Sequence, residues 1–179
     1  MTSRDKAFHS ALVQKDKFDE LVSLRYVNMN DIPDDLGDYD FCWSICALEH
    51  LGSIEQGLDF ICNSLKTVRK GGLAIHTTEF NYLCDNETID NWPTVLFLRK
   101  HFEEVAARLE AEGHYVAPLE FDVGDGVLDK FVDVPPYAFG DTHLKLSIDG
   151  YACTCFGIVI RRGEIQQSSS PPSAKEDCR

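Results

Sequence analysis

A strand, helix and strand pattern between residues 39 and 78 constrains the fold most. Residues 39–45 form a short run that is apolar on both faces, which predicts a central parallel strand covered by helices on each side. A helical stripe follows, with apolar residues every three or four positions: Ile54, Leu58, Ile61, Leu65 and Val68. Ser53 is spaced to cap this helix, and Gly71-Gly72 is expected to end it. Residues 73–78 resume as a strand, so the unit is βαβ and predicts a parallel sheet.

The flanking segments extend the pattern into an α/β fold. Residues 21–27 are rich in β-branched and aromatic side chains and predict another buried strand, with 115–121 as a further one. A second helix is predicted around 102–109, closed by Gly113. Asp149-Gly150 between two alternating runs predicts a hairpin of 144–148 with 151–160. The expected fold is a Rossmann-like, mostly parallel sheet with helices on both faces and a C-terminal antiparallel hairpin, truncated at its N-terminus.

The sequence divides into three parts. Residues 1–20 are a polar N-terminal segment with no clear domain signal, and 21–163 are expected to form one α/β domain. Residues 164–179 combine glutamine, serine, proline and charge, which predicts a disordered tail.

Charge and cysteine usage exclude several function classes. A formal net charge of -13 repels phosphate backbones and anionic lipid headgroups, so nucleic acid is not an expected partner. No stretch approaches the length that crosses a bilayer, and we expect no membrane association. The 7 cysteines contain no CxxC pair, which disfavours a thiolate zinc site and suits a reducing cytoplasm.

Three segments, in order along the chain, resemble motifs of the class I S-adenosylmethionine-dependent methyltransferases. Residues 27–33 resemble the third-strand motif, 39–51 the fourth-strand motif, and 65–73 the turn from a helix into the fifth strand. The predicted hairpin at 144–160 resembles the antiparallel sixth and seventh strands that close that fold. The resemblance implies S-adenosylmethionine as cofactor and methyl transfer to a small molecule or a saccharide hydroxyl.

The resemblance also implies which residues lie near the cofactor. In an open parallel sheet, ligands bind outside the carboxyl ends of the strands. By resemblance, Asn28 and Met29 border the adenine, while Ser44 and Ile45 lie near the methionine portion. The family more often has an acidic residue where this chain has Asn28, although an amide can also bond the adenine edge.

One part of the family pattern is lacking. No glycine-rich strand-to-helix turn precedes residue 21, and no acidic residue ends a second strand there. Glycine lets the backbone approach the cofactor, and the carboxylate holds the ribose hydroxyls, so we expect weak cofactor binding. The chain is then a fragment, a splice form or a mispredicted reading frame, or another chain supplies the missing half. The alternative function is a non-catalytic or partner-completed binding module, as a homo-oligomer or with a completing partner chain.

Three histidines near the expected strand ends, together with Glu49, are the candidate catalytic residues. His50, next to Glu49, has a suitable intrinsic pKa for a general base, and His76 and His143 are expected to line the same pocket. Alternatively, Glu49-His50 caps a helix start. Quinol O-methyltransferases resemble this segment and use glutamate and histidine as magnesium ligands, but they have a further glutamate where this chain has Cys46. A thiol is a poor magnesium ligand, so no metal is expected. The G-x-G-x-x-G fingerprint does not occur, which disfavours a dinucleotide-dependent oxidoreductase.

Overall fold

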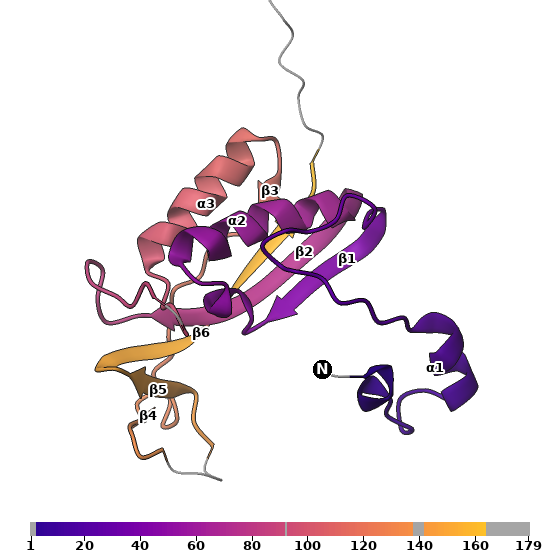
Figure 1. The fold of residues 1–179 in the computed structure, drawn as a ribbon. Coiled ribbons are helices and arrows are strands. Elements are labelled where there is room, and N and C mark those ends of the chain that lie inside the picture. The colour runs from indigo at the N-terminus through magenta and orange to yellow at the C-terminus, as the bar shows by residue number, and fades with distance from the viewer. Residues whose placement is uncertain (1–2, 92, 138–141, 164–179) are drawn as a thin grey trace, which may run out of the picture.

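The strand, helix and strand unit is present in the computed structural model, which describes residues 3–91, 93–137 and 142–163 (Figure 1). Its parts are β1 (Tyr39–Ile45), α2 (Ile54–Ser64) and β2 (Val68–Asn81). The two strands pair in parallel. The hydroxyl of Ser53 accepts a hydrogen bond from the Gln56 backbone N–H at 3.2 Å, so the predicted cap of α2 is confirmed.

The remaining elements are short, apart from one helix and one strand. The helical ones are η1 (Arg4–Ala7), α1 (Lys15–Leu21), η2 (Leu48–His50), η3 (Leu65–Thr67) and α3 (Arg99–Ala111). The strands are β3 (Tyr115–Val116), β4 (Val132–Asp133), β5 (Lys145–Ile148) and β6 (Tyr151–Arg161). The predicted helix around 102–109 is therefore confirmed as the centre of α3.

The sheet is mixed rather than mostly parallel. Its strand order is β1-β2-β6-β5-β4, with β3 paired to β6. β1 with β2 and β4 with β5 are parallel, whereas β6 is antiparallel to its neighbours. The predicted C-terminal hairpin is confirmed as β5 and β6, with Asp149 and Gly150 at φ 47° and 88° as a type I′ turn requires. The α/β class holds, and the antiparallel β6 sets the character of the sheet.

One predicted strand is absent, and another is shorter than predicted. Residues 21–27 form no strand: α1 ends at Leu21, and the chain continues as an exposed loop with an isolated bridge between Asn28 and Asp31. The predicted strand at 115–121 is reduced to the two residues of β3. An apolar run becomes a strand only where a partner offers ladder hydrogen bonds, and β1 lies at the edge of the described sheet with no second neighbour.

The glycine pair also has a different role from the predicted one. α2 ends at Ser64, and Gly71-Gly72 lies inside β2. The pairing with β1 shifts register between Tyr39 and Phe41 at this place, and Gly71 adopts φ 75°. A Cβ on Gly72 would lie 2.7 Å from the Asp40 carbonyl oxygen. The glycines therefore permit a bulge and a close backbone approach instead of ending the helix.

The core lies on one side of the sheet. Both α2 and α3 cover the same face (Figure 1), and their apolar residues form one buried cluster with β2 and β6; its largest members include Ile61, Phe80, Phe97, Phe102, Phe156 and Ile160. The prediction of helices on both faces is wrong for the described residues. β1 is an edge strand whose outward side chains, such as Trp43 and Phe41, are exposed.

The N-terminal segment forms a small cluster of its own. The ring of Phe18 in α1 packs edge-on against Phe8 at a centroid distance of 5.3 Å, and Arg4 pairs with Asp19 at 2.7 Å. Phe18 is buried but belongs to no part of the main core cluster. The predicted tail at 164–179 lies outside the described residues.

Candidate functional site at the tips of two parallel strands

The carboxyl ends of β1 and β2 meet at one place. Cys46 follows β1 with φ 42°, and its backbone N–H donates to the Thr77 carbonyl at 3.0 Å. The chain then turns through η2 before α2 begins. Because β1 and β2 run in parallel and in register, this turn brings Glu49 and His50 beside the last residues of β2.

A thiol and two carboxylates gather at these tips. Single ligand atoms of Cys46, Glu49 and Glu79 all lie within 4.8 Å of one another. Glu49 is fully buried, and the Thr78 hydroxyl donates to its carboxylate at 3.0 Å. Burial raises the pKa of Glu49. Burial, together with the negative charge of Glu49, also raises the pKa of the Cys46 thiol to about 11.

This cluster is a poor site for a hard cation. Magnesium and calcium prefer oxygen ligands, and a thiol binds metal only after it loses its proton. The raised pKa keeps Cys46 protonated at neutral pH. The cluster therefore offers a hard cation only two carboxyl groups, with Cys46 as their neutral neighbour.

His50 has the geometry of a general base. Its Nδ1 lies 2.9 Å from the Pro93 carbonyl oxygen and 3.2 Å from the Thr94 hydroxyl. A carbonyl oxygen only accepts, so the neutral ring carries its proton on Nδ1 and a lone pair on Nε2. Nε2 lies 3.9 Å from the Glu49 carboxylate, and the side chain is half exposed. The free nitrogen can therefore reach a substrate hydroxyl, with a carboxylate near enough to stabilise the imidazolium.

His76 is a structural residue, which corrects its prediction as a strand-end catalyst. It lies in the middle of β2 with no exposed surface, and burial lowers its pKa to about 4. Its Nδ1 is 2.8 Å from the Ser44 hydroxyl and its Nε2 is 3.0 Å from the Ser64 hydroxyl. Ser64 donates to the Ile61 carbonyl, so it accepts from Nε2–H, and Ser44 donates to Nδ1. A neutral His76 thus joins β1, β2 and α2.

His143 belongs to the opposite end of the strand order. It precedes β5, and its Nδ1 pairs with the Asp133 carboxylate of β4 at 3.0 Å. Both β2 and β6 separate β5 from β1, the strand that precedes His50. The predicted common pocket of His50, His76 and His143 is therefore wrong, and only His50 remains at the tips.

The four residues predicted to contact a cofactor do not converge. Asn28 lies in the exposed loop and accepts from the Asn30 backbone, while Met29 packs against the core cluster. Ser44 points to the helix side, where His76 occupies its hydroxyl, and Ile45 points to the opposite, exposed face. Alternate residues of a strand face opposite sides, so Ser44 and Ile45 cannot both line one crevice through their side chains.

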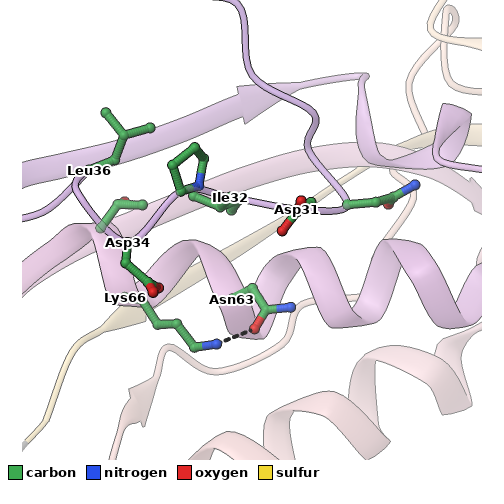
Figure 2. Close-up of a pocket in the computed structure, with 9 residues that line it drawn as sticks. Asp31, Ile32, Asp34, Leu36, Asn63 and Lys66 are labelled. Carbon is green, nitrogen blue, oxygen red and sulfur yellow. Dashed lines mark hydrogen bonds between the residues drawn. The ribbon is translucent and has the colours of Figure 1, made fainter.

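A pocket of about 220 Å³ lies elsewhere, between the loop at 30–36 and the end of α2 (Figure 2). The loop contributes Asp31 and Asp34, and the helix end contributes Asn63 and Lys66, whose ammonium donates to the Asn63 side chain at 2.8 Å. α2 starts near the strand tips and ends where β2 begins. Its Lys66 end therefore lies at the opposite end of α2 from His50, while Asn30, which also lines the pocket, donates to the Leu51 carbonyl at 3.0 Å. The pocket is smaller than pockets that enclose a nucleotide-sized ligand.

Sequence reasoning placed Cys46 and Glu79 at strand ends, but it did not predict their cluster with Glu49 and it missed the partner of His50. Glu79 and Cys46 enter the cluster because parallel register aligns the two strand ends. The alternation of residues along β2 gave a usable signal. His76, Thr78 and Phe80 face the buried side of the strand, so Glu79 faces the opposite side. The partner of His50 had no signal, because Pro93 lies 43 positions away in an irregular loop.

No protein-family model matches the chain, and no curated protein matches it significantly. Among the described residues, no helix is both long and apolar enough to cross a bilayer. The case for a function therefore depends on the residues at the strand tips.

Proposed function

We propose that the chain is an S-adenosylmethionine-dependent methyltransferase-like protein that acts on a small molecule or saccharide hydroxyl. The observation that carries the proposal is the position of His50, at the tip of β1, with Nδ1 bonded to a carbonyl and Nε2 free. The parallel unit of β1, α2 and β2, followed by the antiparallel pair β5 and β6, supports the same proposal. It is the arrangement expected from the resemblance of residues 39–73 and 144–160 to this family, whereas residues 27–33, which resemble its third-strand motif, form no strand.

The residues of the chain supply acid–base chemistry and orientation. Nε2 of His50 can take the proton of an acceptor hydroxyl, and the Pro93 carbonyl holds the ring by accepting from Nδ1. The buried Glu49 carboxyl beside the ring stabilises its charged form. When bound, S-adenosylmethionine supplies the methyl group.

The residues that resemble cofactor contacts fit the cofactor poorly. Met29 and the Ser44 hydroxyl are used by the fold, which leaves the Asn28 amide and the tip backbone. The glycine-rich turn expected for the family does not occur among residues 1–20. We therefore expect weak binding, and no catalytic step is assigned to cofactor contacts of these residues.

Calorimetric titration with S-adenosylmethionine tests the proposal first. The expected result is measurable heat at millimolar cofactor, with a stronger signal for S-adenosylhomocysteine plus an acceptor. An absence of heat at millimolar concentrations of either compound would mean that this chain alone is not a methyltransferase.

Turnover tests the role of His50. Catechols and monosaccharides are offered as acceptors, and release of S-adenosylhomocysteine is measured. His50→Gln should lower the rate by about 10²–10⁴-fold, the usual contribution of a general base. The matched control is His9→Gln, because His9 is exposed in the N-terminal segment and away from the tips. Equal loss in both variants would remove His50 from the mechanism.

A second candidate function is a partner-completed binding module. One observation favours it: β1 carries large exposed apolar side chains on the face that α2 and α3 do not cover. Soluble monomers rarely expose a large contiguous apolar area without using it. Gel filtration separates the two candidates, because a stable monomer at all concentrations argues against completion by a partner.

A further inference from the structure

Side chains in register across four strands form one uncovered sheet face. Residues directly opposite each other in neighbouring strands point to the same side. The register therefore defines two neighbouring rows on the side away from α2 and α3: Phe41, Leu73, Arg161 and Tyr115, then Trp43, Ile75 and Val159. The next rows hold Ile45, Thr77 and Gly157, then Glu79 and Cys155. We call this surface the open sheet face.

The open sheet face is large and apolar. Phe41, Trp43 and Ile45 are 68%, 79% and 68% exposed, so no described segment covers β1. Tyr115 is 50% exposed at the other margin. A whole aromatic side chain has about 150–250 Å² of surface. At their exposed fractions, Phe41, Trp43 and Tyr115 together expose about 400 Å² to solvent. The aliphatic residues bring the patch to roughly 600 Å², the upper end of what monomers expose.

We propose that the open sheet face binds a second copy of this chain, sheet against sheet, around a two-fold axis. Two such faces remove roughly 1,200 Å² from water, which reaches the lower bound of specific interfaces. Aligned sheets pack about 10 Å apart with their strands within about 30° of each other. Gly157, which has only the Thr77 methyl within 4 Å of its Cβ position, leaves room for large side chains of the second copy.

Charge makes the face complementary to itself. Arg161 lies in the first row, with its guanidinium 4.9 Å from the Tyr115 ring centroid, and Glu79 lies three rows further along the strands. A two-fold axis across the strands reverses the order of the rows. It brings each Arg161 of β6 over the row that holds Glu79 of β2 in the second copy, with a sideways offset of one strand spacing, about 5 Å. The dimer therefore contains this ion pair twice, at the two ends of an apolar centre.

The same charges argue against a dimer built by edge pairing. An antiparallel pairing of β1 with β1 of the second copy would leave Arg161 uninvolved, because β6 is two strands from that edge. It would also leave Ile75 and Val159 of the open sheet face in water. A face-to-face contact covers these residues, and it agrees with the second candidate function while requiring no methyl transfer.

Sedimentation equilibrium over micromolar to millimolar concentrations tests the proposal. The chain should approach twice its mass of 20.2 kDa with rising concentration. Trp43→Asp should raise the dissociation constant at least about 30-fold, as expected for a central aromatic residue of an interface. The matched control is Val127→Asp, since Val127 is an equally exposed apolar residue that lies on no strand. It should leave association unchanged.

Circular dichroism shows whether both variants stay folded, which is expected because both replaced side chains are exposed. A chain that sediments as a monomer throughout would overturn the proposal. So would equal effects of the two substitutions, because they would reflect added negative charge alone.

A charge exchange identifies the arrangement. Arg161→Glu and Glu79→Arg should each weaken the dimer about tenfold by placing like charges together. The double variant keeps the net charge of -13 and should recover most of the lost affinity. No recovery, or no effect of either single substitution, would contradict the face-to-face dimer and point to edge pairing. Calorimetry with S-adenosylmethionine is independent of this outcome, so failure of one proposal is separate from failure of the other.

Discussion

At the scale of single residues, the two histidines nearest the parallel strands differ because of their hydrogen-bond partners. His76 is bonded on both ring nitrogens by serines and has no route to solvent. His50 is bonded on one nitrogen only by a carbonyl and is half exposed. Sequence reasoning predicted both as catalysts, because residue type and proximity to a strand end do not reveal which face of the strand a side chain occupies.

The buried His76 predicts a loss of stability in mild acid. Its pKa is lowered from 6.5 to about 4 in the folded chain, so the unfolded chain binds the proton first as pH falls. The contribution to stability is complete above pH 6.5 and declines toward pH 4, by about 3 kcal/mol for a shift of this size. Urea unfolding at pH 7 and pH 4.5 measures it.

Other groups titrate in the same range, so the comparison needs a non-titrating variant. His76→Gln keeps a donor and an acceptor but takes up no proton. The stability difference between wild type and His76→Gln should shrink as pH falls. A difference that stays constant between pH 7 and pH 4.5 would contradict a neutral, buried His76.

Cys46 should react slowly with alkylating agents although it is exposed. Partial desolvation of its sulfur and the nearby Glu49 raise its pKa to about 11, so little thiolate exists at neutral pH. Relative to an ordinary thiol of pKa 9.0, the thiolate fraction at pH 8 falls roughly 100-fold. The rate of iodoacetamide modification of the Cys46 peptide, measured by mass spectrometry against glutathione, should be lower, although by less than this factor because a thiolate of higher pKa is more nucleophilic. A rate equal to that of glutathione would mean that the thiol is not in this environment.

At the scale of elements, local signals predicted some features well. The Ser53 cap, α3 and the hairpin of β5 and β6 follow from short-range chemistry, and all three are confirmed. The predicted strand at 21–27 failed because a strand needs a partner, and its sequence does not state which strand lies beside it. The end of α2 was misplaced because a Gly-Gly pair permits a bulge in a strand as well as a helix cap.

The hairpin turn predicts a measurable cost of substitution. Gly150 has φ 88°, which is unfavourable for a β-branched residue, so Gly150→Val should destabilise the fold by about 1–2 kcal/mol. The control is Gly157→Ala in β6, the strand that follows the turn, where only the Thr77 methyl lies within 4 Å of the Cβ position and φ is not positive. Thermal unfolding should show a lower midpoint for the first variant alone. A similar loss in both would indicate that β6, and not the turn, is sensitive.

At the scale of the whole molecule, the sheet is covered on one face and open on the other. The sequence predicted the apolar character of β1 and placed it at the centre, because both faces of the run are apolar. The structure places β1 at the edge, with Trp43 and Phe41 in solvent. Composition alone does not distinguish a side chain that a helix covers from one that we propose a second copy of the chain covers. The site at the tips could likewise be predicted only to the extent that the sequence shows where β1 and β2 end.

The central claim is that the tips of β1 and β2, and not the pocket near Lys66, are where ligands bind. A titration of the ¹⁵N-labelled chain with S-adenosylmethionine, followed by amide chemical shifts, tests it most directly. The account predicts shift changes that are largest at Cys46, Glu49, His50 and Glu79. Changes confined to Asn63 and Lys66, or none at millimolar ligand, would contradict it.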